Sequence, residues 1–546
     1  MPAGGQGEIA RATRHRNLRR LPPVLRAPGA AAFSPAPEPT VPQPQYDHLI
    51  KGGRILDPAT GRDETADVGI AGGVIARIGD IPTREGARVI DASGRVVCPG
   101  FIDIHAHGQS VAADWMQAFD GVTTTLELEV GVLPVEAWYA RQERAGRALH
   151  YGAAASWIFA RKQVMAGMAP DPAKHSMEMM GEGADDRGGW SSGIANDAQV
   201  ADIVAILAQG LRAGGIGIGI AHGYAPGAGI KEMTRVCDLA AGRGVPTFTH
   251  IGFMANADPR SSEDSYVRII GLAAATGAHM HICHLNSTSL QDIRRCRHLI
   301  EQAQARGLPV TVEAYPYGTG STVVSASFFA APDFPERTGT GYGSIELIHS
   351  RRHMRDRDDL LSASGADPAA LVAWHFLDTA HDAAQQDLLD LSVLYPGGTI
   401  ASDAMPWVEP DGALYGGTEW PLPERLSSHP RSAATFTKFI GEYHRARGRI
   451  GLMEAVAKCT ILPARVIEGC VPAMRRKARL QEGCDADVIV FDPARIAGAA
   501  SFERMTAPAI GVEAVLVGGV PLILDGVLDT QARPGRALRG AGHPDE

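Results

Sequence analysis

Residues 98–108 read Cys-Pro-Gly-Phe-Ile-Asp-Ile-His-Ala-His-Gly, and this stretch decides how the rest of the chain is interpreted. Proline and glycine mark its start and glycine its end, and the mostly apolar, β-branched residues between them predict a short buried strand. Because side chains alternate along a strand, His105 and His107 point to the same face. Two imidazoles at one strand end can close on a single metal ion. A His-x-His pair alone is more often two ordinary polar side chains, so other parts of the chain have to decide.

From residue 99 to about 410, strand-like segments alternate with helix-like ones, which predicts βα units and a parallel sheet. Eight segments have the composition of strands: 101–107, 122–130, 152–158, 215–220, 246–251, 278–284, 309–315 and 398–403. Eight such strands predict an α/β fold of the TIM-like (β/α)8 barrel type, whose active site lies at the carboxyl ends of the strands.

Strand patterns on both sides of this region predict a second, smaller module. Short strands with glycine turns run through residues 46–98, and a counterpart follows at 480–530. We expect the two sets to form one small β-sandwich, with the barrel domain, residues 99–479, inserted between them. Residues 404–436 follow the last barrel strand and predict a long loop that acts as a lid. Residues 1–45 are rich in arginine, proline and alanine, which predicts a disordered tail.

The overall composition, 45% hydrophobic and 21% charged residues, is typical of a globular protein. A net charge of −9 argues against nucleic acid as a partner, and no apolar run is long enough for a membrane-spanning helix. Seven scattered cysteines without a Cys-x-x-Cys pair indicate reduced thiols in a cytoplasmic enzyme. The arginine pair at 19–20 leaves secretion by an N-terminal signal as a second interpretation. We expect a small-molecule substrate and a homo-oligomer.

Residues that bind metal ions recur at the carboxyl ends of the predicted strands, where a barrel places its active site. Imidazoles and carboxylates at one barrel mouth suit one or two divalent ions, most often zinc, although other divalent metals fit the same ligands. Each of these side chains alone has an ordinary structural explanation, so their joint occurrence carries the prediction. They are His105, His107, Glu127, Glu129, His250, His284 and Asp403.

Several ordered motifs resemble those of the amidohydrolase superfamily, and within it the D-aminoacylase or N-acyl-D-amino-acid deacylase branch. The resemblance covers roughly residues 46–530 and rests on 99–107, 121–124, 223–227, 281–284, 313–317, 402–403, 429–431, 462–465 and 485–492. It implies a barrel flanked by a β-sandwich, and a metal-dependent amide hydrolase that removes the acyl group from N-acyl-D-amino acids. D-glutamate deacylases share the Leu-Glu-Leu-Glu run at 126–129, which favours N-acyl-D-glutamate. The alternatives are a hydantoinase-like or dihydroorotase-like hydrolase of cyclic amides, carbamates or dipeptides, and, less favoured, a non-catalytic binding protein.

The resemblance also implies metal ligands. His105, His107 and Asp403 would hold one metal position, and His250 and His284 the other. D-aminoacylases place a cysteine after the second strand, where this chain has Glu-Val-Gly at 129–131. A carboxylate must then replace the thiolate. We expect Glu129 in that role, with Glu127 as the alternative. Because this exchange replaces a soft ligand with a hard one, the identity and the number of the bound metal ions stay open.

Further roles follow from the same resemblance. Asp403 would act as the general base, and Tyr224 would donate a hydrogen bond to the oxyanion. Arg431 would bind the substrate carboxylate, unless it is an ordinary surface charge. Tyr315 and Tyr317 would shape the substrate pocket, unless they only pack against the barrel.

Overall fold

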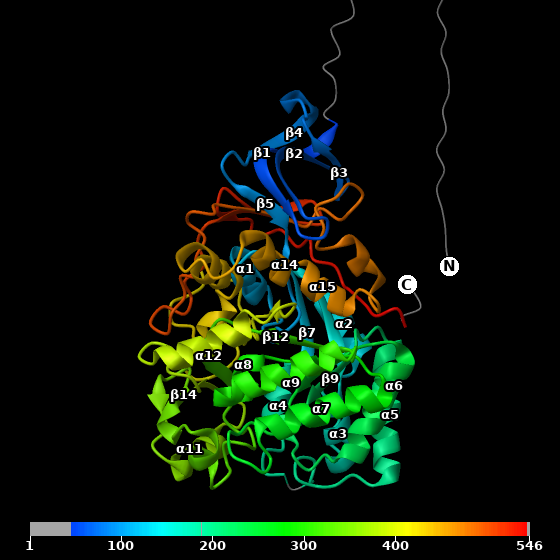
Figure 1. The fold of residues 1–546 in the computed structure, drawn as a ribbon, viewed down its shortest axis with the longest axis vertical. Helices are drawn as coiled ribbons and strands as arrows, with labels where there is room; N and C mark the ends of the chain where they lie inside the picture. Colours follow the sequence, from blue (N-terminus) through cyan, green and yellow to red (C-terminus); the bar gives the residue numbers. More distant parts are fainter. Residues whose placement is uncertain (1–44, 187, 543–546) are drawn as a thin grey trace, which may run out of the picture. The chain divides into compact units, whose positions relative to one another are not determined.

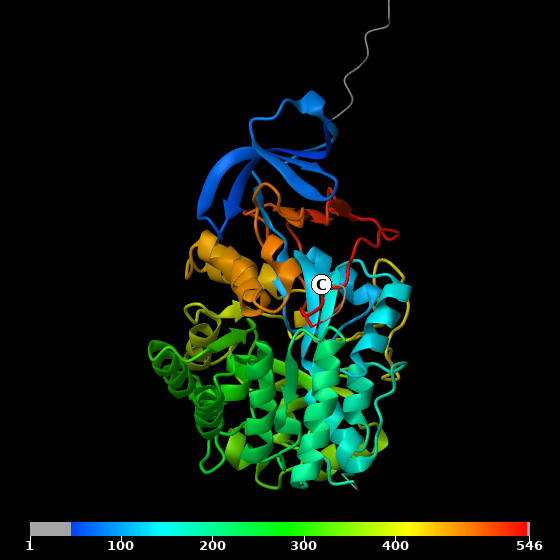
Figure 2. The ribbon, with the colours of Figure 1, turned by 90° about the vertical axis from the view of Figure 1, so that its right-hand side faces the viewer.

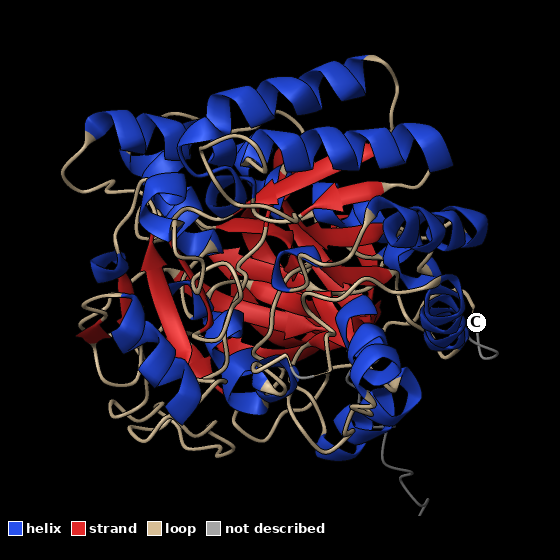
Figure 3. Cartoon of the chain, turned by 90° about the horizontal axis from the view of Figure 1, so that it is seen from below, coloured by secondary structure: helices blue, strands red, loops and turns tan. Residues whose placement is uncertain are grey.

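Eight parallel strands form the sheet on which the chain is built (Figures 1 and 3). A computed structural model describes residues 45–186 and 188–542, so the predicted tail, apart from residue 45, lies outside the described residues. The strand order is β17-β12-β11-β10-β9-β8-β7-β6. The strands are β6 (Phe101–Asp103), β7 (Val122–Val132), β8 (His150–Ser156), β9 (Ile218–Ala221), β10 (Thr247–His250), β11 (Met280–Ile282), β12 (Val310–Ala314) and β17 (Thr399–Ile400).

The barrel closes through residues that directly follow its first and last strands. The amide of His107 donates to the carbonyl oxygen of Ala404 at 2.7 Å, and the amide of Asp403 donates to that of His105 at 2.8 Å. Ala106 and Ala404 pair as an isolated parallel bridge. The predicted barrel is therefore confirmed, and its closing seam fixes the backbone of three predicted metal ligands.

Amphipathic helices cover the outside of the strands (Figure 3). In α9, for example, the buried residues Ile293, Cys296, Ile300 and Ala303 recur at helical spacing and face the barrel. The helices are α1 (Val111–Phe119), α2 (Val135–Ala145), α3 (Trp157–Ala166), α4 (Ser176–Gly181), α5 (Asp197–Arg212), α6 (Ile230–Arg243), α7 (Ser262–Thr276), α8 (Leu285–Ser289), α9 (Ile293–Ala305), α10 (Phe334–Thr338), α11 (Arg357–Ala366), α12 (Ala383–Val393), α13 (Phe436–Phe439), α14 (Leu452–Cys459) and α15 (Ile461–Ile467).

Strands from the two ends of the described chain join in one nine-stranded sheet, in which β5 pairs antiparallel with β18. Figure 2 shows the blue N-terminal strands next to the orange and red C-terminal segments. Both halves contribute to one apolar cluster that includes Ile50, Val68, Val488 and Leu516, so the predicted joint β-module is confirmed. The strands are β1 (Tyr46–Asp57), β2 (Arg62–Ala71), β3 (Val74–Gly79), β4 (Gly86–Asp91), β5 (Val96–Pro99), β18 (Val488–Phe491), β19 (Val512–Val517), β20 (Val520–Leu524) and β21 (Val527–Leu528).

A third, four-stranded sheet lies in the chain between β12 and β17, in the order β13-β16-β14-β15. It consists of β13 (Thr319–Val323), β14 (Ile345–Leu347), β15 (Arg352–His353) and β16 (Leu371–His375). The predicted lid, residues 404–436, is mostly irregular and contains the short 3-10 helix Pro430–Ser432. Within the described ranges, every helix is too short or too polar to cross a bilayer.

Candidate active site

Four buried side chains meet next to the barrel seam: His105, His107, Glu129 and Asp403. Nε2 of His105 lies 3.1 Å from Nε2 of His107 and 3.2 Å from Oε2 of Glu129. Oδ1 of Asp403 lies 3.4 Å from both of these nitrogens, and Nε2 of His107 lies 3.5 Å from Oε2 of Glu129. Residues from three places in the sequence thus bring two nitrogens and two oxygens together.

These separations fit a tetrahedral metal site. Ligand bonds of about 2.0–2.2 Å place the four atoms around a tetrahedral zinc ion about 3.3–3.6 Å apart. The measured separations, 3.1–3.5 Å, are close to that range. Two imidazoles and two carboxylates are also a donor set that divalent transition metals accept. The residues present therefore fit the ion that the sequence predicts.

His284 and His250 lie beside this group. Nε2 of His284 is 2.8 Å from Oε1 of Glu129, the second oxygen of this carboxylate, and 3.9 Å from Oδ2 of Asp403. The His250 ring contacts the His284 ring edge to face, with centroids 5.1 Å apart. All six predicted ligands therefore lie in one cluster, and Glu129 has one oxygen toward His105 and His107 and the other toward His284.

Three of the histidines are oriented by hydrogen bonds in which Nδ1 takes part. Nδ1 of His105 contacts Glu313 at 2.5 Å, Nδ1 of His107 contacts Glu127 at 2.9 Å, and Nδ1 of His250 contacts the Ile251 carbonyl at 3.0 Å. A proton held at Nδ1 leaves the Nε2 lone pair free for a metal ion. Glu127, the alternative to Glu129 as a metal ligand, contacts Nδ1 of His107 instead.

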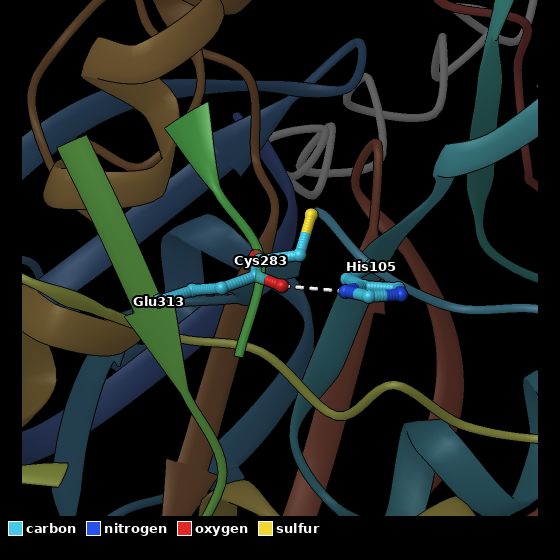
Figure 4. A group of neighbouring side chains, drawn as sticks. All are labelled: His105, Cys283 and Glu313. Carbon is cyan, nitrogen blue, oxygen red and sulfur yellow. Dashed lines mark hydrogen bonds and ion pairs between the residues drawn. The ribbon is translucent and has the colours of Figure 1, made fainter. Parts of the chain in front are cut away.

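Cys283 and Glu313 lie on the Nδ1 side of His105, as Figure 4 shows. Burial raises the pKa of the Cys283 thiol well above its usual value, so the thiol stays protonated. Glu313 also contacts Nε2 of His281 at 3.1 Å. The Glu313 carboxylate therefore lies between two imidazoles and holds the His105 ring at Nδ1, which leaves Nε2 facing the ligand cluster.

Asp403 forms an ion pair with Arg431, whose Nη2 is 2.8 Å from Oδ2. Burial raises the pKa of Asp403, but the charges of Arg431 and His105 more than offset this and hold the pKa below its ordinary value. Arg431 is only 1% exposed, so it is not a surface charge. Its guanidinium lies over the Tyr315 ring at 4.6 Å, and Nε and Nη1 have no partner among the described residues. It thus retains buried donors for an anion.

The ligand cluster opens into a cavity of about 550 Å³, including the part open to solvent. Tyr224 lines it and shares a hydrogen bond of 2.6 Å with the Thr322 hydroxyl. Burial raises the pKa of Tyr224, so its hydroxyl stays protonated. Tyr315 also lines the cavity, and its hydroxyl has no partner in the described part of the chain. Tyr317 faces elsewhere, since its hydroxyl donates to the Ala434 carbonyl oxygen.

A family model for the amidohydrolase family matches residues 88–523, which is most of the chain. The chain belongs to this family. Among curated relatives, an N-acyl-D-glutamate deacylase of Alcaligenes xylosoxydans xylosoxydans is 28% identical over 516 residues, covering 91% of this chain and 97% of the relative. A D-aminoacylase of the same organism is 25% identical and covers 87% and 94%. Among solved structures, the N-acyl-D-glutamate deacylase of Bordetella bronchiseptica, complexed with zinc and a phosphonate inhibitor, has a TM-score of 0.70 at 23% identity and covers 91% and 100%.

Sequence reasoning assigned no role to Glu313 in this amidohydrolase. Glu313 lies near the carboxyl end of the predicted strand 309–315, so the strand-end rule that selected the other residues would have selected it too. Asp103 shares strand parity with His105, yet it hydrogen-bonds to Gln117 and Ser402 and stays out of the ligand cluster. Ser321 lines the cavity from β13, a strand that the sequence pattern did not predict.

Proposed function

We propose that this amidohydrolase is a zinc-dependent deacylase that releases the acyl group from N-acyl-D-amino acids. The observation that carries the proposal is the near-tetrahedral group of His105, His107, Glu129 and Asp403 at the barrel mouth, with the Arg431 guanidinium against Asp403. The names of the curated relatives support the choice of N-acyl-D-amino acids as the substrate class.

His105, His107, Glu129 and Asp403 would hold the first ion. His284, His250 and the second oxygen of Glu129 would hold another if two are bound. A bound divalent ion would supply Lewis acidity toward the scissile carbonyl and would acidify a water molecule.

The remaining chemistry is that of the chain's own groups. Asp403 is ionised at neutral pH, so Oδ2 can accept a proton from the attacking water and return it to the leaving amine nitrogen. Tyr224 keeps its proton and can donate a hydrogen bond to the oxygen on which negative charge develops. The unpartnered nitrogens of Arg431 would bind the α-carboxylate of the substrate.

Metal analysis combined with a substrate panel tests the proposal. We expect the purified protein to hold at least one divalent ion per chain and to hydrolyse N-acetyl-D-amino acids faster than their L-enantiomers. A hydantoin or a dipeptide as the preferred substrate would contradict the proposed function.

Asp403→Asn provides the mechanistic control. Because the variant lacks the proton acceptor, we expect hydrolysis to fall by about 10²–10⁴-fold. Metal content is measured on the same sample, because Asp403 also belongs to the ligand group. If the variant retains wild-type turnover, Asp403 is not the base.

Several expectations from the sequence stay predictions. They are a cytoplasmic location, a homo-oligomeric state, a lid formed by residues 404–436, domain boundaries at residues 99 and 479, and the absence of nucleic-acid and membrane partners. Size-exclusion chromatography with light scattering would measure the oligomeric state.

A further inference from the structure

Away from the ligand cluster, much of the cavity wall is apolar. Its apolar side chains come from separate parts of the fold: β7, α4, the segment after β10, the segment after β13, and β16. The side chains are those of Val130, Met177, Met180, Met254, Phe328 and Trp374. Each is buried or half-buried, so these side chains offer a substrate dispersion contacts and the release of water. Ser287, Ser321 and Thr322 add hydroxyl groups to the lining, but no positive charge.

The charged groups that line the cavity, histidines aside, are the carboxylates of Glu129 and Asp403; no lysine or arginine of the described chain is among the lining residues. Arg431 lies directly behind the wall, where its Nη2 contacts Asp403 and the Ser321 carbonyl oxygen, both part of the cavity lining. One guanidinium can form an ion pair with one substrate carboxylate. Under the proposed function, this is the α-carboxylate.

A neighbouring cleft contains two more arginines. It shares Met254 and Phe328 with the cavity. Arg337 in this cleft donates from Nη2 to the carbonyl oxygens of Ala257, Pro259 and Arg260. Arg260 itself is exposed to solvent. Neither arginine is among the residues that line the cavity itself.

We propose that the enzyme acts on N-acyl-D-amino acids with uncharged, apolar side chains and discriminates against acidic ones; this rests on the proposed function. A second carboxylate would lose its hydration against the apolar walls without gaining a cation, and it would face Glu129 and Asp403. The enzyme therefore differs in substrate from the N-acyl-D-glutamate deacylase that it resembles in sequence.

The test compares substrates of matched size on the zinc-loaded full-length enzyme. N-acetyl-D-methionine is similar in length to N-acetyl-D-glutamate and lacks the second charge, and N-acetyl-D-glutamine separates polarity from charge. We expect kcat/KM for the methionine derivative to exceed that for the glutamate derivative by at least about 100-fold, because a buried carboxylate would stay unpaired. Equal or preferred turnover of the glutamate derivative would overturn the inference while leaving the deacylase proposal intact. No hydrolysis of any N-acyl-D-amino acid would overturn the deacylase proposal itself.

A designed cation tests the cause of the discrimination. Met254→Lys places an ammonium at the apolar wall, and Met254→Gln is the uncharged control of similar length. We expect the ratio of kcat/KM for N-acetyl-D-glutamate to that for N-acetyl-D-methionine to rise at least about 10-fold in the lysine variant relative to the glutamine variant. Circular dichroism shows whether both variants fold, and the wild-type panel decides the question if one does not. An unchanged ratio in two folded variants would mean that a missing cation is not the cause.

Discussion

At the scale of single residues, the cluster depends on side chains that never touch the proposed ion. His105 would donate its Nε2 lone pair to a metal only if Nδ1 carries the proton. Glu313 accepts the hydrogen bond from Nδ1, with an N···O distance of 2.5 Å. The carboxylate is buried and shared with His281. It therefore fixes both the tautomer and the orientation of the ring.

Glu313→Gln should weaken zinc binding, because an amide accepts the Nδ1 proton less strongly than a carboxylate. Loss of such a supporting partner typically costs about 10–100-fold in metal affinity. A competitive titration with a chromophoric chelator measures the dissociation constant directly. Glu346→Gln is a matched control, since Glu346 is also a buried carboxylate that contacts a histidine, His375, but lies outside the ligand cluster. Equal zinc affinity in the Glu313 variant and the control would refute the role of Glu313.

Two of the proposed ligands also sit on unusual backbone. Asp403 has φ of 52° and His284 has φ of 33°, a region that non-glycine residues rarely adopt. Such conformations persist where the surrounding structure imposes them, and they concentrate at functional sites. Here the seam hydrogen bond from Asp403 to the His105 carbonyl oxygen contributes to that constraint.

At the scale of elements, close contact between strands positions Glu129. The register of β7 against β8 shifts between Glu127 and Val132. Strand β9, which pairs with the other side of β8, approaches this irregular stretch at Gly219, where an added Cβ would lie 2.4 Å from the carbonyl oxygen of Glu129. The absence of a side chain at this position therefore allows the bulged strand to present its carboxylate.

Gly219→Ala should destabilise the protein, because the new methyl group would overlap main-chain atoms that cannot rotate away. Overpacking of this kind costs about 1–3 kcal/mol. Gly271→Ala is the control: this exposed glycine lies within α7, its added Cβ would meet nothing within 4 Å, and alanine should stabilise the helix by about 0.5–1 kcal/mol. Denaturant unfolding of both variants measures the two opposite shifts. Equal stability of the Gly219 variant and the wild type would show that β7 can move away.

All eight barrel strands follow from the sequence, because buried parallel strands leave short apolar runs between helix patterns. The first is shorter than expected: we expected 101–107, whereas β6 spans Phe101–Asp103, so His105 and His107 follow the strand rather than lie on it. The third is displaced: we expected 152–158, whereas β8 spans His150–Ser156. Ser156 accepts a hydrogen bond from the Phe159 amide and begins α3, so its apolar neighbours Trp157 and Ile158 are helical. The cavity walls could not be predicted from the sequence. Met177 and Trp374 belong to segments in which the sequence pattern does not distinguish apolar residues that line a cavity from those that pack in the core.

At the scale of the whole molecule, buried polar contacts connect the barrel with the nine-stranded sheet. Asp487, just before β18, accepts a hydrogen bond from His150 of β8 at 2.9 Å and forms an ion pair with Lys477 at 2.7 Å. Burial raises the pKa of Asp487, but His150 and Lys477 lower it far below its ordinary value. The described residues form one compact unit, consistent with these contacts.

Metal removal should therefore lower the stability of the whole unit and not only its activity. The proposed ligands lie on β7 and β10 or follow β6, β11 and β17, so a bound ion would connect strands on both sides of the barrel seam. An ion that binds only the folded state at 100 times its dissociation constant adds about 2.7 kcal/mol to the free energy of unfolding, which corresponds to about 2–3 °C in Tm for a chain of this length.

Differential scanning calorimetry before and after treatment with a chelator measures this shift, and added zinc should restore the higher Tm. Asp390→Asn is a useful comparison, because Asp390 is a buried carboxylate that accepts hydrogen bonds from Arg447 and lies outside both the ligand cluster and the cavity lining. This variant should unfold at a lower temperature and still respond to zinc by the same increment. A chelator-treated wild type that has lost its ion but keeps its Tm would show that the ligand group holds its geometry without a metal.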